Sequence, residues 1–151
     1  FSEMAIELWF RADNLTPLQV LAGTYNFLGG LNNKGMSIGI QSDLIRSFLA
    51  IGTGGYQYVD WTGCSTGVWY HAMLFHSTVN STLEIYGNGI LRDSKDAVGY
   101  TATIANFRMG EDPGGTADLD GGIAFVRVYN PLPPVTIALQ HYNQERRWFG
   151  V

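Results

Sequence analysis

The sequence has one cysteine, few charged residues and no long apolar run. Because Cys64 is the only cysteine among 151 residues, no intrachain disulfide can form. No apolar stretch approaches the roughly 20 residues that a membrane-spanning helix needs, so we expect no membrane span. Lys and Arg together number nine, are scattered along the chain, and leave a formal net charge of −4. Binding to nucleic-acid phosphates requires a clustered basic surface, so we expect no nucleic-acid partner.

Glycine and aromatic residues are, in contrast, abundant. The chain has 19 glycines, 13% aromatic residues and 46% hydrophobic residues. This hydrophobic content is that of a packed globular protein, and the length predicts one domain over residues 1–151. Glycine at turns combined with aromatic residues on strands is typical of an all-β protein.

Short alternating segments predict the strands. Near the start, Met4, Ile6, Leu8 and Phe10 alternate with less apolar positions, which is the period of a half-buried strand. Asn88-Gly89 predicts a hairpin turn, because both residues accept positive φ. Further strand candidates lie at 18–24, 36–40, 44–51, 68–76, 82–86, 90–91, 101–109 and 123–129. About ten short strands at this turn spacing predict an antiparallel β-sandwich.

One helix is expected near the end of the chain. Pro133-Pro134 suits a helix entry, where a missing backbone N–H costs little. Val135, Leu139 and Tyr142 then follow at helical spacing, and the pattern continues to Arg146. The predicted architecture is therefore an all-β antiparallel sandwich with one short C-terminal helix.

Four segments carry a resemblance to a known family. They are Ile6 to Asp13, Trp69 to Ala72, Leu83 to Gly89, and Gly121 to Asn130. In this order they are similar to the laminin-G-like, concanavalin-A-like jelly-roll domains of lectins, glucanases, and bacterial and phage surface proteins. The resemblance implies a domain that recognises or adheres at an extracellular or virion surface. One departure is Ala124, at a place where family members often carry an acidic residue.

The sequence offers no catalytic constellation. A retaining glycosidase needs two carboxyl groups roughly 5 Å apart, whereas Glu3 and Glu7 lie four residues apart on one predicted strand. No Gly-x-Ser-x-Gly nucleophile motif is present. His71 and His76 are five residues apart on a strand, so they should point to opposite faces and share no metal. We therefore expect no enzymatic activity.

Three aromatic residues are the candidate ligand-binding residues. Tyr56, Tyr58 and Trp61 lie between glycines in the segment 52–63, and Tyr56 and Tyr58 should share one side of a strand. Sugars present apolar C–H faces that stack on aromatic rings, while tyrosine and tryptophan also form hydrogen bonds. The alternative is that these rings belong to the core or to a subunit contact.

An acidic loop is the candidate metal site. Glu111, Asp112, Asp118 and Asp120 lie within ten residues, and calcium takes six to eight oxygen ligands from such flexible loops. The resemblance also points to one calcium at a loop rim. The alternative, which we favour, is a solvated turn in which Asp and Gly serve the turn geometry, so no cofactor is required.

Three functions remain after these arguments. The first is a non-catalytic recognition module that binds a glycan or a protein. The second is a structural virion protein, such as a capsid decoration, fibre or tail component, which contacts a capsid or other virion protein or forms a homo-oligomer. The third is a glycoside hydrolase, which the scarcity of paired carboxylates disfavours.

Overall fold

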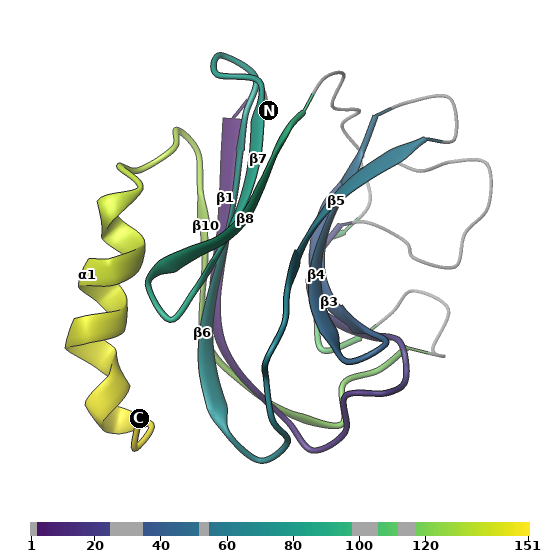
Figure 1. Ribbon diagram of the computed structural model, residues 1–151, viewed down its shortest axis with the longest axis vertical. Helices are drawn as coiled ribbons and strands as arrows, with labels where there is room; N and C mark the ends of the chain where they lie inside the picture. Colours follow the sequence, from purple (N-terminus) through teal and green to yellow (C-terminus); the bar gives the residue numbers. More distant parts are fainter. Residues whose placement is uncertain (1–2, 25–34, 52–54, 98–105, 112–116) are drawn as a thin grey trace.

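The fold consists of two facing β-sheets and one helix that covers the outer face of one of them (Figure 1). The computed structural model describes residues 3–24, 35–51, 55–97, 106–111 and 117–151. Within these residues each sheet has five strands, and all neighbouring strands pair antiparallel. The expected all-β sandwich with a short C-terminal helix is confirmed.

Sheet A has the strand order β10-β1-β6-β7-β8, and sheet B has the order β5-β4-β3-β2-β9. The bounds in sheet A are β1 Glu3–Ala12, β6 Trp69–Ser77, β7 Thr82–Gly87, β8 Ile90–Asp96 and β10 Gly121–Tyr129. Those in sheet B are β2 Gln19–Gly23, β3 Met36–Gln41, β4 Leu44–Ala50, β5 Tyr56–Trp61 and β9 Arg108–Met109. The helices are α1 Thr136–Glu145 and the short 3-10 helix η1 Arg146–Trp148.

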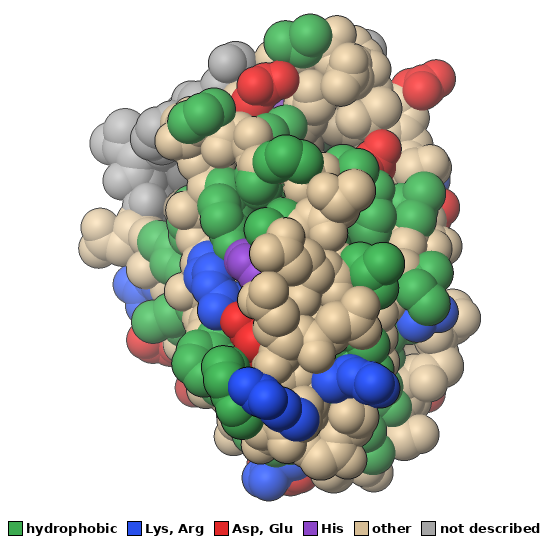
Figure 2. Space-filling model, turned by 90° about the vertical axis from the view of Figure 1, so that its left-hand side faces the viewer, with side chains coloured by type: hydrophobic (Ala, Val, Ile, Leu, Met, Phe, Trp, Pro, Cys, Tyr) green, Lys and Arg blue, Asp and Glu red, His purple; other side chains and the backbone are tan. Residues whose placement is uncertain are grey.

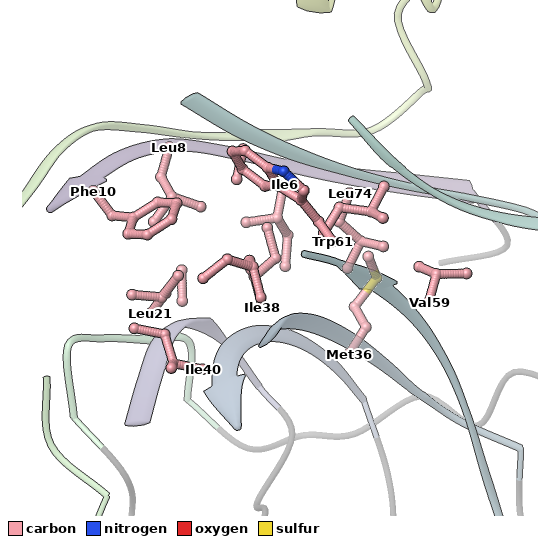
Figure 3. Packing of buried hydrophobic residues seen from close by; sticks show 14 of the residues in the cluster. Ile6, Leu8, Phe10, Leu21, Met36, Ile38, Ile40, Val59, Trp61 and Leu74 are labelled. Atoms are coloured by element: carbon pink, nitrogen blue, oxygen red, sulfur yellow. The ribbon is translucent and has the colours of Figure 1, made fainter. Parts of the chain in front are cut away.

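The main core lies between the two sheets. Every second residue of β1, from Met4 to Phe10, points toward sheet B, and each is at most 6% exposed. Ile38 and Trp61 are among the side chains that meet them from sheet B (Figure 3). The alternation predicted for this strand is therefore the pattern that builds the sandwich.

β1 differs in one respect from the half-buried strand that its alternation predicts. Ala5, Glu7 and Trp9, on its other face, are also 0% exposed. The reason is α1, which lies against the outer face of sheet A (Figure 1). Ala138 of the helix packs there with Ala5, Met73 and Phe75.

Two of the three apolar residues expected at helical spacing do not face the sheet. Val135 and Leu139 are each 48% exposed, whereas Ala138 and Glu145 are buried. Tyr142, the third expected residue, does face the sheet and stacks on Trp9 with a ring-centroid distance of 5.9 Å. The contact therefore contains polar side chains that a search for apolar periodicity does not count.

The predicted hairpin at Asn88-Gly89 is present between β7 and β8, with φ of 53° and 75° at the two residues. Of the strand expected over 101–109, only Arg108–Met109 is seen as β9, and residues 101–105 lie outside the described part of the chain. β10 contains a bulge opposite β1, where Phe125 has a φ of 51°. This bulge places the Phe125 ring at the surface, where it is 46% exposed.

Candidate functional site

The outer face of sheet B, turned away from sheet A, carries an aromatic patch formed by Phe48, Tyr56 and Tyr58. Sheet B is curved, and this face is its concave side (Figure 1). The three ring centroids lie 5.9 to 6.4 Å apart. Phe48 is 5% exposed, whereas Tyr56 is 48% exposed. The patch thus has a buried base and an exposed ring.

Strand pairing explains why these rings meet. Phe48 of β4 lies directly opposite Tyr58 of β5, and Ala50 lies opposite Tyr56. Side chains two residues apart on a strand share a face, so both tyrosines are on the same side as Phe48. Ala50, opposite the exposed ring, is 0% exposed and packs with Phe48.

A charged pair borders the aromatic patch. The Arg46 guanidinium lies 4.1 Å from the centre of the Tyr58 ring and donates to both carboxylate oxygens of Asp60, at 2.6 and 2.9 Å. Its third hydrogen bond, of 2.9 Å, goes to Gln41. The hydrogen bond to Asp60 raises the pKa of Arg46 above its ordinary value, so the guanidinium stays charged. Polar donors and acceptors therefore lie next to a stacking surface.

Trp61 lies on the other face of β5, away from the two tyrosines. Its side chain is 4% exposed and sits in the core between the sheets (Figure 3). The ring meets Phe10 and Tyr70 edge to face, with centroids 6.4 and 5.4 Å away. The structure therefore brings Tyr56 and Tyr58 together and separates Trp61 from them.

The four predicted calcium ligands do not form a described site. Asp112 lies outside the described residues, and the exposed Glu111 forms an ion pair of 2.9 Å with Arg108. Asp118 and Asp120 are exposed in the turn before β10, and the Asp120 backbone N–H donates to Gln19. Across the described ranges, no three His, Cys, Asp or Glu side chains are grouped so that they could hold a metal. Calcium binding stays a prediction.

A buried polar network, formed by Glu7, His71, Arg127, Tyr129, His141 and Glu145, lies between sheet A and α1. The Glu7 carboxylate, on β1, accepts from His71 Nε2 at 2.8 Å, from His141 Nδ1 at 2.8 Å, and from the Tyr129 hydroxyl. Arg127 connects Glu7, at 3.2 Å, to Glu145 of the helix, at 2.5 Å. Figure 2 shows a histidine side chain with basic and acidic side chains near it, on the face of the molecule where α1 lies.

The network holds the Glu7 carboxylate in its charged form. Burial alone would raise the pKa of Glu7, but hydrogen bonds from His71, Tyr129 and His141 outweigh it and lower the pKa to about 2. Burial and the hydrogen bond to Glu7 raise the pKa of Tyr129, so its hydroxyl stays protonated and can donate. Because Glu7 is fully buried and paired, this arrangement is suited to fastening the helix and not to meeting a substrate.

Sequence reasoning did not find this network. Glu7 and Glu145 are 138 positions apart and share Arg127 only because β1, β10 and α1 are adjacent in space. The signal that was available is a Glu in the middle of an otherwise apolar strand, at the position Ile6-Glu7-Leu8. A charge at such a position requires a partner in the fold.

The sequence itself assigns the family. Residues 1–133 match the concanavalin A-like lectin/glucanases superfamily. The chain belongs to this superfamily. The match ends before α1, so the helix and its two network residues, His141 and Glu145, lie beyond the matched region. No curated protein sequence matches the chain closely enough to count as a relative.

Solved structures of carbohydrate-binding domains share the fold. The CBM40 of the Ruminococcus gnavus IT-sialidase, solved with α2,3-sialyllactose, superposes with a TM-score of 0.75 at 17% identity, covering 92% of this chain and 82% of that one. A putative carbohydrate-binding protein from Bacteroides ovatus superposes with a TM-score of 0.72 at 19% identity, covering 93% of this chain and 40% of that one. A third structure comes from work on the cell entry of botulinum neurotoxin type C and its interaction with two ganglioside molecules. It superposes with a TM-score of 0.74 at 16% identity, covering 95% of this chain and 36% of that one. At these identities the likeness concerns the fold.

In the described part of the chain, α1 has ten residues and no helix has the length and apolar character needed to cross a membrane.

Proposed function

We propose that this protein is a non-catalytic glycan-binding module that uses the aromatic patch on sheet B. The observation that carries the proposal is the exposed Tyr56 ring beside Tyr58, with the charged pair Arg46–Asp60 at its border. Aromatic rings stack on sugar C–H faces, and the bordering groups donate to and accept from hydroxyls. Carbohydrate-binding domains among the structural neighbours support this choice.

The absence of catalysis is part of the proposal. A retaining or inverting glycosidase needs two carboxyl groups on either side of a bound sugar. At the patch, Asp60 is paired with Arg46. Glu7 lies on the other sheet, buried beneath the helix. We place the module on an extracellular surface, where glycan ligands are found.

The test measures sugar binding by variants of the patch. A glycan array that includes sialyllactose and lactose identifies a ligand, and calorimetry then compares the protein with its Tyr56→Ala variant. Losing a central stacking ring should weaken binding by about tenfold or more, or at least ~1.4 kcal/mol. Trp148→Ala is the matched control, because this ring is 58% exposed and belongs to η1, away from the patch. Equal binding by the Tyr56→Ala variant would exclude the patch as the site.

A structural role in a virion or another assembly is the second candidate, and one observation favours it. Apolar side chains are exposed along β10 and next to it, with Phe125 46%, Val128 49% and Trp148 58% exposed. Phe125 and Trp148 are in contact, with ring centroids 5.5 Å apart. Exposed apolar surface at a sheet edge is a feature of protein contacts.

Light scattering tests this second role. Asn tolerates the positive φ of position 125, so Phe125→Asn should keep the fold while removing the exposed ring. If the surface serves assembly, the wild-type protein should form an oligomer that this variant does not form. A monomer at every concentration would remove the argument for self-assembly.

A further inference from the structure

A pocket of about 270 Å³ opens on the outer face of sheet A, beyond the N-terminal end of α1. Its floor includes Phe75 of β6, which is 3% exposed, and one wall is the segment 132–135 that leads into the helix. The pocket is on the opposite side of the sandwich from the aromatic patch. A ligand here would not compete with one on sheet B.

Two carboxylates line this pocket from different strands. Glu3 belongs to β1 and Glu84 to β7, and β6 runs between these strands with Ser77 opposite Glu3 and Phe75 opposite Glu84. The fold therefore places one acid on each side of the floor.

Among the described residues, each carboxylate accepts a hydrogen bond from a neutral hydroxyl group. The Ser77 hydroxyl donates to Glu3 at 3.0 Å, and the Tyr86 hydroxyl donates to Glu84 at 3.0 Å. Burial and the hydrogen bond to Glu84 raise the pKa of Tyr86 to about 12, so this hydroxyl remains a donor. Within the described ranges, no Lys or Arg forms an ion pair with Glu3 or Glu84.

Three other acids, in contrast, each form an ion pair with an arginine. Asp13 is paired with Arg11, Asp60 with Arg46, and Glu111 with Arg108. The pocket thus combines two negative charges with an apolar floor and wall, the latter containing Leu132, Pro133, Pro134 and Val135. A ligand that fits must bring a positive charge and some apolar surface.

We propose that this pocket binds a primary ammonium group carried on a short apolar chain. An ammonium group has three N–H donors and no acceptor, which suits a pocket whose charged groups are carboxylates. Charged hydrogen bonds of this kind are the stronger ones. The methylene groups lie against Phe75 and the proline wall, and the aromatic ring adds attraction for a cation close to its face. The volume restricts the ligand to a small amine or one lysine side chain.

The first experiment separates charge from apolar contact. Pentylammonium chloride and 1-pentanol have the same chain length, and only the first is charged. Amide chemical shifts from a titration followed by NMR should move around Phe75 and Glu84 with pentylammonium and remain unchanged with pentanol. Equal responses to the two probes, or no response to either in the millimolar range, would overturn the proposal.

The second experiment removes one charge at a time. Glu3→Gln and Glu84→Gln keep an acceptor for Ser77 and Tyr86, so the fold should be retained, as circular dichroism can verify. Each change should weaken pentylammonium binding about tenfold, or about 1.4 kcal/mol, because a neutral amide replaces the charged acceptor of the ammonium group. Glu111→Gln is the matched control, because Glu111 is exposed and lies beyond β9 of the other sheet. Affinity that falls equally in the control, or that stays unchanged in both pocket variants, contradicts the site.

A third arm distinguishes the source of the ammonium group. Nα-acetyl-lysine amide presents a lysine side chain with a peptide backbone attached. Tighter binding of this compound than of pentylammonium would assign the pocket to a lysine of a protein partner, and tighter binding of pentylammonium would assign it to a free amine.

Discussion

At the scale of single residues, Gly87 and Trp61 show how closely the core is packed. A Cβ at position 87 would lie 2.5 to 2.7 Å from atoms of the Trp61 indole. The last residue of β7 must therefore lack a side chain for the ring to remain between Phe10 and Tyr70.

Gly87→Ala should destabilise the protein by about 1–3 kcal/mol, the usual cost of adding a methyl group to a packed core. Urea denaturation measures this change in the free energy of unfolding. A Trp61→Phe background supplies the control, because a smaller ring leaves space for the new methyl group. The cost of Gly87→Ala should then be smaller than in the wild type, and equal costs in the two backgrounds would argue against this contact.

The two-residue period of a strand determines which aromatic residues could be predicted from the sequence to share a face. Tyr56 and Tyr58 are two positions apart, and their shared face followed directly from the period of a strand. Trp61 is three positions from Tyr58, so the same rule places it on the opposite face, where it is 4% exposed. Grouping the three by chemical type hid this difference. The neighbours Arg46 and Phe48 come from β4 and depend on strand pairing, which the sequence does not state.

At the scale of elements, the contact between α1 and sheet A depends on the buried network. Glu7 contributes a carboxylate from the sheet, and His141 and Glu145 contribute from the helix. Trp9 adds a hydrogen bond of 2.7 Å from its indole N–H to Glu145. Removing one member of such a buried group leaves the others unpaired, which is strongly destabilising.

The low pKa of Glu7 predicts acid sensitivity. Its pKa is about 2 in the folded protein, against the ordinary value of 4.5 that we take for the unfolded chain. Between pH 2 and pH 4.5 the folded protein therefore binds fewer protons at Glu7 than the unfolded chain does. The charged Glu7 stabilises the folded state by about 3 kcal/mol, since each unit of pKa shift corresponds to about 1.4 kcal/mol. This stabilisation is present above pH 4.5 and is lost as the pH falls toward 2. Urea denaturation of the wild type at pH 6 and at pH 3 measures the loss.

Glu7→Gln provides the comparison, because the amide does not titrate. This variant should be less stable at pH 6, and its stability should change less between pH 6 and pH 3 than that of the wild type. The same pH dependence in both proteins would assign the acid sensitivity to other carboxylates.

The helix also shows the limit of apolar patterns. The strands were predictable because their buried positions are mostly aliphatic or aromatic and recur every second residue. Pro133-Pro134 and the helical spacing predict the extent of α1, but of the side chains that face the sheet they include only Tyr142. The side of α1 toward the sheet also contains Glu145 and the part-buried His141, whose burial depends on partners far away in the chain.

At the scale of the whole molecule, the sandwich belongs to a large superfamily, whereas α1 and η1 lie beyond the matched residues 1–133. The helix nevertheless covers Ala5, Met73 and Phe75. Trp9 is likewise enclosed, with the Phe149 ring stacked on it at a centroid distance of 4.2 Å. Without the helix, the two sheets would expose an outer face to water that is largely apolar and contains the charged Glu7.

A chain that ends at Val135 should keep its strands but lose stability and bind a dye for exposed apolar surface. The missing segment removes His141 and Glu145 from the network and uncovers Trp9. Far-ultraviolet circular dichroism, thermal melting and 8-anilinonaphthalene-1-sulfonate fluorescence measure the three effects. Deleting only Gly150 and Val151 is the control. An unchanged melting temperature after the longer deletion would show that the helix is dispensable.

The position of α1 also determines how the domain can be mounted on a solid support. The C-terminus lies at the end of the helix, on the side of the molecule away from sheet B (Figure 1). A tether joined after Val151 would hold the protein by its helical side and leave the concave sheet facing the solution. Biosensor chips and bead-based capture assays built in this orientation should keep Tyr56 accessible.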